Sequence, residues 1–102
     1  MRSITPNEVH ALDDAVILDV REPHELTQAR IDGTLDIPLG ELVERLGEVP
    51  RDTTVYVICH VGGRSAQATQ YLEAHGIDAV NISGGILQWY QSGLPVTLAG
   101  AS

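Results

Sequence analysis

The chain of 102 residues is poor in several residue types, and each shortage excludes a class of protein. It has one cysteine, which excludes an intrachain disulfide and a zinc site built from several cysteines. No apolar stretch approaches the roughly 20 residues that span a membrane, and the N-terminus contains no apolar signal core. We therefore expect no membrane partner and a cytoplasmic location, where reducing conditions keep a single thiol free. Lysine and phenylalanine are also missing, and the sequence gives no functional reason for this.

Positive charge is scarce as well. Six arginines stand against 14 acidic residues, for a formal net charge of −8, which argues against nucleic acid as a partner because binding to it needs a basic footprint. The second half of the chain has a single arginine, Arg64, and it follows the only cysteine, Cys59, by five residues. The four histidines are scattered without metal-ligand spacing, so we expect neither a metal nor another cofactor.

The order of apolar segments predicts one α/β domain over residues 1–102 with a mostly parallel sheet. Runs rich in branched residues predict strands buried on both faces, at 15–20, 53–58 and 79–82, with a shorter candidate at 35–38. Helices are predicted from Pro6, behind a Thr5 and Glu8 capping box, and over 40–46, 65–75 and 86 to about 91. In such folds ligands bind beyond the C-terminal ends of the strands, and Cys59 lies at that end of the 53–58 strand.

The segment after Cys59 has the composition of an anion-binding loop. Two of the four residues between Cys59 and Arg64 are glycines, which allow backbone N–H groups to converge on one point. The start of the next helix adds partial positive charge and Arg64 adds a full one. A lone cysteine at the end of an apolar strand is most often inert, but an inert cysteine would not need this loop. We therefore predict a reactive thiol with a lowered pKa.

Four motifs in order resemble the single-domain rhodanese family of sulfurtransferases, over nearly the whole chain. They are Asp19-Val20-Arg21 followed by Glu25, the segment 31–39, the loop 59–65, and Ser83-Gly84-Gly85 with Trp89 and the segment 93–96. The resemblance implies a rhodanese-like, central five-stranded sheet, mostly parallel and flanked by helices. It implies Cys59 as the catalytic nucleophile that carries a persulfide, cradled by a substrate-binding loop of His60, Val61, Gly62, Gly63 and Arg64.

The expected reaction is transfer of sulfur from a small anionic donor, thiosulfate or a persulfide, to a thiophilic acceptor. An alternative is a sulfur-carrier or interaction module that exchanges sulfur with a protein partner and has little small-molecule turnover; a weaker one is a redox sensor. Cysteine phosphatases place five residues between the cysteine and the arginine. The four found here fit one sulfur atom better than a phosphoryl group.

Several positions depart from the family pattern or allow two interpretations. His60 stands where thiosulfate-using members commonly have a basic residue, which predicts weak thiosulfate affinity that improves toward about pH 6. Arg30 and Thr34 replace the usual histidine and alanine of the 31–39 motif region. As supporting residues, the Asp19 and Arg21 pair either orients the active-site loops or is a structural ion pair. Ser65 is expected to support the loop from the helix start, and Trp89 to be core or pocket wall.

Overall fold

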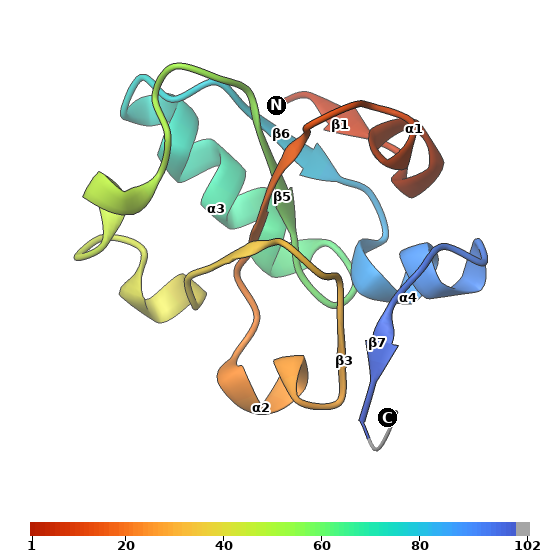
Figure 1. Ribbon diagram of the computed structural model, residues 1–102. Helices are drawn as coiled ribbons and strands as arrows, with labels where there is room; N and C mark the ends of the chain where they lie inside the picture. Colours follow the sequence, from red (N-terminus) through yellow and green to blue (C-terminus); the bar gives the residue numbers. More distant parts are fainter. Residues whose placement is uncertain (100–102) are drawn as a thin grey trace.

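A five-stranded parallel sheet forms the centre of the molecule, as the computed structural model, which describes residues 1–99, shows (Figure 1). The spatial order is β1-β6-β5-β2-β4, and every neighbouring pair is parallel. The strands are β1 (Ser3–Ile4), β2 (Val16–Asp19), β4 (Leu35–Asp36), β5 (Val55–Ile58) and β6 (Ala79–Ile82). The predicted α/β class and its parallel sheet are confirmed.

Helices cover both faces of the sheet (Figure 1). They are α1 (Pro6–His10), α2 (Pro23–Leu26), α3 (Gly63–Ala74) and α4 (Gly85–Gln91). The α3 helix packs on β5 and β6 from one side, and α1 and α4 pack together on the other. A small antiparallel pair, β3 (Ala29–Arg30) and β7 (Thr97–Leu98), lies outside the main sheet.

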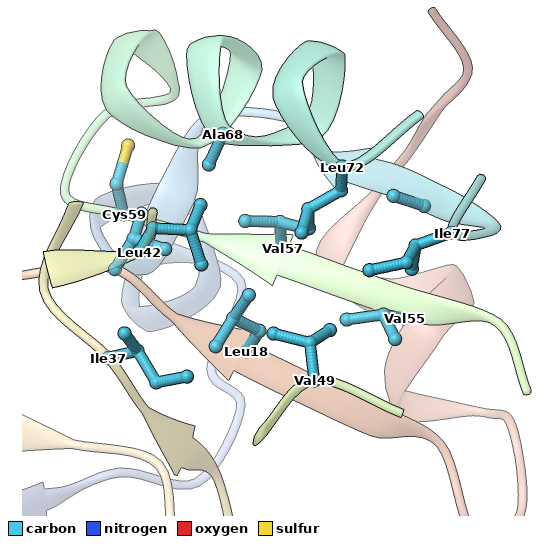
Figure 2. Packing of buried hydrophobic residues seen from close by; sticks show 12 residues of the cluster. Leu18, Ile37, Leu42, Val49, Val55, Val57, Cys59, Ala68, Leu72 and Ile77 are labelled. Atoms are coloured by element: carbon cyan, nitrogen blue, oxygen red, sulfur yellow. The ribbon is translucent and has the colours of Figure 1, made fainter. Parts of the chain in front are cut away.

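Side chains of β5 alternate between two apolar clusters because successive residues of a strand point to opposite faces. Val55, Val57 and Cys59 join the cluster under α3, together with Ala68 and Leu72 of that helix, as Figure 2 shows. Ile58 joins the second cluster, with Val9 of α1 and Trp89 of α4. Apolar side chains therefore cover both faces of β5, and this packing holds the C-terminal end of the strand, where Cys59 follows, in a fixed position.

The predicted helix over 40–46 is wrong. The segment forms two short 3-10 helices, η1 (Leu39–Glu41) and η2 (Leu46–Glu48), joined by turns. Leu42 is fully buried, whereas Val43, predicted to share its face, is 67% exposed. Gly40 and Gly47 weaken helix formation here, and a run this short does not overcome the cost of helix nucleation.

The other boundaries deviate less. Thr5 caps α1 as predicted: Thr5 Oγ1 accepts from the Glu8 N–H at 3.2 Å, and Glu8 Oε1 accepts from the Thr5 N–H at 3.1 Å. The α3 helix begins at Gly63 rather than at Ser65. The sequence analysis missed α2 and the two-residue strands β1, β3 and β7, which are too short to show a hydrophobic period.

Candidate active site

Cys59 lies at the junction of β5 and α3, and two glycines, one within the loop and one at the start of α4, make this junction possible. Gly62 is the N-cap of α3 with φ +117°, a left-handed conformation that favours glycine. Gly85, at the start of α4, has φ +61°, and a Cβ atom there would lie 2.5 Å from the Cys59 carbonyl oxygen. That close approach lets the Ile86 N–H donate to the Cys59 carbonyl at 2.8 Å. The first turn of α4 thereby fixes the backbone of Cys59.

The Cys59 sulfur lies at the N-terminal end of α3 (Figure 2). Cys59 is only 1% exposed. The Gly62 N–H donates to Sγ at 3.0 Å, and the Sγ–H donates to the Ser65 hydroxyl at 3.3 Å. Burial acts to raise the pKa of the thiol. Hydrogen bonds that the Ser65 side chain and the backbone of Ser65, Gly62 and Arg64 make to the ionised sulfur outweigh this effect and lower the pKa. The site thus favours a thiolate through converging N–H groups.

Arg64 forms an ion pair with an acidic residue, whereas the sequence predicted that its positive charge would act on the sulfur. Its guanidinium forms a bidentate ion pair with Glu25 of α2, with distances of 2.6 Å to Oε1 and 2.8 Å to Oε2. The Arg64 hydrogen bonds hold the pKa of the Glu25 carboxyl at about 2. Glu25 therefore stays ionised and neutralises much of the positive charge that Arg64 brings to the loop.

Asp19 and Arg21 form a buried ion pair behind this arrangement. The Arg21 Nε and Nη2 atoms donate to Asp19 at 3.0 Å and 2.9 Å, and the side chains are 3% and 0% exposed. Arg21 also donates to the Ala29 carbonyl at 2.8 Å, and at 3.5 Å to the carbonyl of Glu25. Neither side chain bonds to Cys59 within the described residues. The pair instead anchors the segment that carries Glu25, so its effect on the loop runs through the Glu25–Arg64 ion pair.

Ser65 contacts a residue that the sequence analysis missed. Its hydroxyl lies 2.5 Å from Oδ1 of Asn81 on β6, and 3.1 Å from the Gly62 carbonyl. Asn81 is 6% exposed and is the only polar residue of the strand Ala79–Ile82. A buried amide in an apolar strand needs a hydrogen-bond partner, and this was the signal that would have found it. Glu25 was visible only as part of a motif.

His60 and Val61 are exposed at the tip of the loop, beside an apolar groove of about 200 Å³. Tyr90, Leu87 and Leu98 are exposed along this groove, whose lining consists of Ala29, His60, Ile86, Leu87, Tyr90, Val96 and Leu98. A larger hollow of about 420 Å³ lies away from Cys59, between α1, α4 and the segment 95–97. Trp89 lines its floor, is 2% exposed, and donates from Nε1 to the Pro95 carbonyl at 3.0 Å, which agrees with its predicted role as core and wall.

Metal-binding clusters are not found in the described part of the chain: no group of three or more histidine, cysteine, aspartate or glutamate side chains could hold an ion. Among residues 1–99, no helix is long and apolar enough to cross a membrane.

Comparison with known proteins decides the family. The family model for the rhodanese-like domain matches residues 5–92. The chain belongs to the rhodanese-like domain family.

The chain is 38% identical over 85 residues to a sulfurtransferase of Allochromatium vinosum, and the match covers 82% of this chain and 79% of the relative. It is 40% identical over 74 residues to YrkF of Bacillus subtilis, provisionally named a sulfur carrier protein; the match covers 72% of this chain and 40% of YrkF. The crystal structure of a rhodanese-related protein from Thermoplasma volcanium superposes with a TM-score of 0.92 at 38% identity, covering 96% of this chain and 99% of the other.

In this rhodanese-like domain, two of the three departures from the family pattern, Arg30 and Thr34, contact the same carboxylate. Arg30 Nη2 donates to Asp36 Oδ2 at 3.1 Å, and the Thr34 hydroxyl donates to Asp36 Oδ1 at 2.6 Å. Arg30 is therefore ion-paired. Its charge, like that of Arg64, is largely matched by a neighbouring acid, so neither arginine is a free anion-binding cation.

Proposed function

We propose that the protein is a sulfurtransferase that moves sulfane sulfur from thiosulfate or a persulfide donor to a thiophilic acceptor through a Cys59 persulfide. The observation that carries the proposal is the Cys59 sulfur itself. It is buried at the N-terminal end of α3, bonded to the Gly62 N–H at 3.0 Å, with a pKa that backbone and Ser65 hydrogen bonds lower. The family and the sulfurtransferase relative support the same reaction class.

The chemistry needs no redox cofactor. The Cys59 thiolate attacks the outer sulfur of thiosulfate, the sulfur–sulfur bond of the donor breaks, and sulfite leaves with the bonding electron pair. The new persulfide is an anion, and the N–H groups of Gly62, Arg64 and Ser65 stabilise it as they stabilise the thiolate. Cyanide or a thiolate then attacks the outer sulfur and regenerates the Cys59 thiolate. Because the reaction needs a free thiol, we place it in a reducing compartment such as the cytoplasm.

The loop recognises the donor mainly through backbone groups. His60 and Val61 form the exposed rim, while Gly62 and Gly63 give the backbone its turn into α3. Since Glu25 neutralises much of the Arg64 charge, a small dianion such as thiosulfate meets little free positive charge. Weak thiosulfate binding follows, and a persulfide donor becomes the better substrate.

A second candidate, a sulfur carrier that exchanges sulfur with a protein partner, is favoured by the surface beside the loop. Val61, Leu87, Tyr90 and Leu98 are 59%, 42%, 55% and 44% exposed, respectively. Exposed apolar side chains grouped in this way beside a reactive residue are typical of protein contact surfaces. The relative named as a sulfur carrier supports this alternative.

Steady-state kinetics with thiosulfate and cyanide test the sulfurtransferase. A persulfide intermediate predicts parallel double-reciprocal lines and a complete loss of turnover in Cys59→Ser, whereas intersecting lines would contradict it. Leu87→Ser and Tyr90→Ser test the carrier, with Val43→Ser as the matched control because Val43 is 67% exposed and lies outside the groove. The carrier predicts transfer from a protein persulfide that depends on salt in the wild type and in all variants, because the chain carries a net charge of −8. This transfer should be slower in the two groove variants only, and thiosulfate turnover should be unchanged and nearly independent of salt.

A further inference from the structure

The Ser65 hydroxyl has one proton and three acceptors within reach. These are the Cys59 sulfur at 3.3 Å, the Gly62 carbonyl at 3.1 Å and Asn81 Oδ1 at 2.5 Å. The shortest of the three distances places the proton on the Asn81 side. The Ser65 lone pairs then face the sulfur and accept the S–H of a neutral thiol.

This arrangement gives a thiolate no hydrogen bond from Ser65, because a thiolate only accepts hydrogen bonds and the Ser65 proton points toward Asn81. When the Cys59 proton leaves for solvent, the Ser65 hydroxyl must turn its own proton toward the sulfur to keep that contact. Asn81 then loses its donor. A side-chain amide solves this problem because rotation by half a turn replaces its oxygen with an NH2 group, which donates to the Ser65 oxygen.

We propose that Asn81 is a positioning residue for Cys59: its amide accepts the Ser65 proton while the sulfur is a thiol, and rotates to donate to Ser65 Oγ when the sulfur is ionised. Asn81 is more than nine-tenths buried, and its side chain bonds only to Ser65 among the described residues. An amide that donates to the hydroxyl also strengthens the hydroxyl as a donor to the sulfur. The inference deepens the proposed function, since it rests on Cys59 as the reactive thiol.

Charged neighbours do not replace Asn81 in this role. None of them hydrogen-bonds to the Ser65 hydroxyl or to the Asn81 amide in the described residues. The charged and titratable residues around the site come from the loop, from α3 and α2, and from the end of β2. They are His60, Arg64, Glu25, Glu22, Asp19 and Arg21.

The test uses the intact wild-type protein labelled with 15N only at asparagine. The chain has two asparagines, and Asn7, exposed on α1, is an internal control. The Asn81 side-chain N–H resonances are followed over about pH 5–10, beside the rate of Cys59 alkylation by iodoacetamide. We expect the Asn81 resonances to titrate with the alkylation midpoint, those of Asn7 not to follow it, and the Asn81 response to vanish in Ser65→Ala. Asn81 resonances that are flat, or that titrate unchanged in Ser65→Ala, would overturn the proposal.

Variants give a second readout that does not depend on sulfur transfer. Asn81→Leu is expected to raise the alkylation midpoint by about half a pH unit, and to add nothing in the Ser65→Ala background. Asn81→Asp, which can only accept and adds a like charge, is expected to raise it by about one unit or more. Ile82→Val is the matched control in the same strand and leaves the midpoint unchanged. A folded Asn81→Leu with the wild-type midpoint would refute the role of Asn81, while sulfur transfer through Cys59 would still stand.

Discussion

Replacing Glu25 with glutamine removes the carboxylate that binds Arg64 while keeping the shape of the side chain. The Glu25 pKa of about 2, against an ordinary 4.5, corresponds to about 3 kcal/mol of stabilisation at pH 7. The two side chains are 21% and 35% exposed, and solvent screening reduces the expected loss in Glu25→Gln to about 1–2 kcal/mol.

The pH dependence of this loss follows from the direction of the pKa change. Because the folded-state pKa of Glu25 is lowered, the contribution is complete above pH 4.5 and disappears as the pH falls toward 2. Urea unfolding at pH 7 and at about pH 2 should therefore show a clear difference between variant and wild type only at the higher pH, with an intermediate difference at about pH 3.5. Glu48→Gln, which breaks an exposed pair with Arg45, is the matched control and should differ less at pH 7. Equal urea midpoints for Glu25→Gln and wild type at pH 7 would show that the Glu25–Arg64 ion pair does not stabilise the fold.

The same variant tests whether Glu25 masks the charge of Arg64. Releasing Arg64 should favour a dianionic donor by about 1 kcal/mol, or roughly fivefold in KM for thiosulfate. The control Glu48→Gln should leave KM unchanged. If KM for thiosulfate stays the same or rises in Glu25→Gln, the charge of Arg64 is not what limits thiosulfate binding.

Other variants test the backbone of the site and its surroundings. Gly85→Ala places a Cβ atom 2.5 Å from the Cys59 carbonyl at φ +61°, so urea unfolding should show a loss of about 2–4 kcal/mol; Gly40→Ala, where nothing lies within 4 Å, is the control. Iodoacetamide alkylation of Cys59 should have a midpoint below that of an ordinary thiol, because the lowered pKa keeps the thiolate populated at lower pH, and Ser65→Ala should raise this midpoint. Thr5→Ala removes the α1 capping box and should cost about 1 kcal/mol in thermal unfolding.

The sequence predicts the backbone of the site better than the direction of its side chains. The strand that precedes Cys59 is rich in branched residues, and two adjacent glycines follow Cys59. This pattern predicts a tight turn from the strand into α3, as the structure shows. Local rules of this kind also predicted the Thr5 cap. They fail over 40–46, where the apolar spacing suits a helix but Gly40, the following Gly47 and the short length favour 3-10 turns.

Sequence reasoning did not predict the contacts between segments that lie far apart along the chain. Arg64 lies 39 residues from Glu25 in sequence, and Ser65 lies 16 residues from Asn81. The spacing of apolar residues along the sequence does not reveal such pairs, because they depend on how α2 and β6 lie beside the loop. The sequence therefore predicted a positive charge at the sulfur, where the structure has an ion pair.

Intact-mass spectrometry tests most directly whether Cys59 carries the transferred sulfur. The purified protein is measured before and after incubation with thiosulfate, and again with a small persulfide, beside Cys59→Ser. We expect a gain of one sulfur atom in the wild-type protein, removed by cyanide and absent in Cys59→Ser. A folded protein with a free thiol that gains no sulfur from either donor, or a gain that persists in Cys59→Ser, would contradict this role of Cys59.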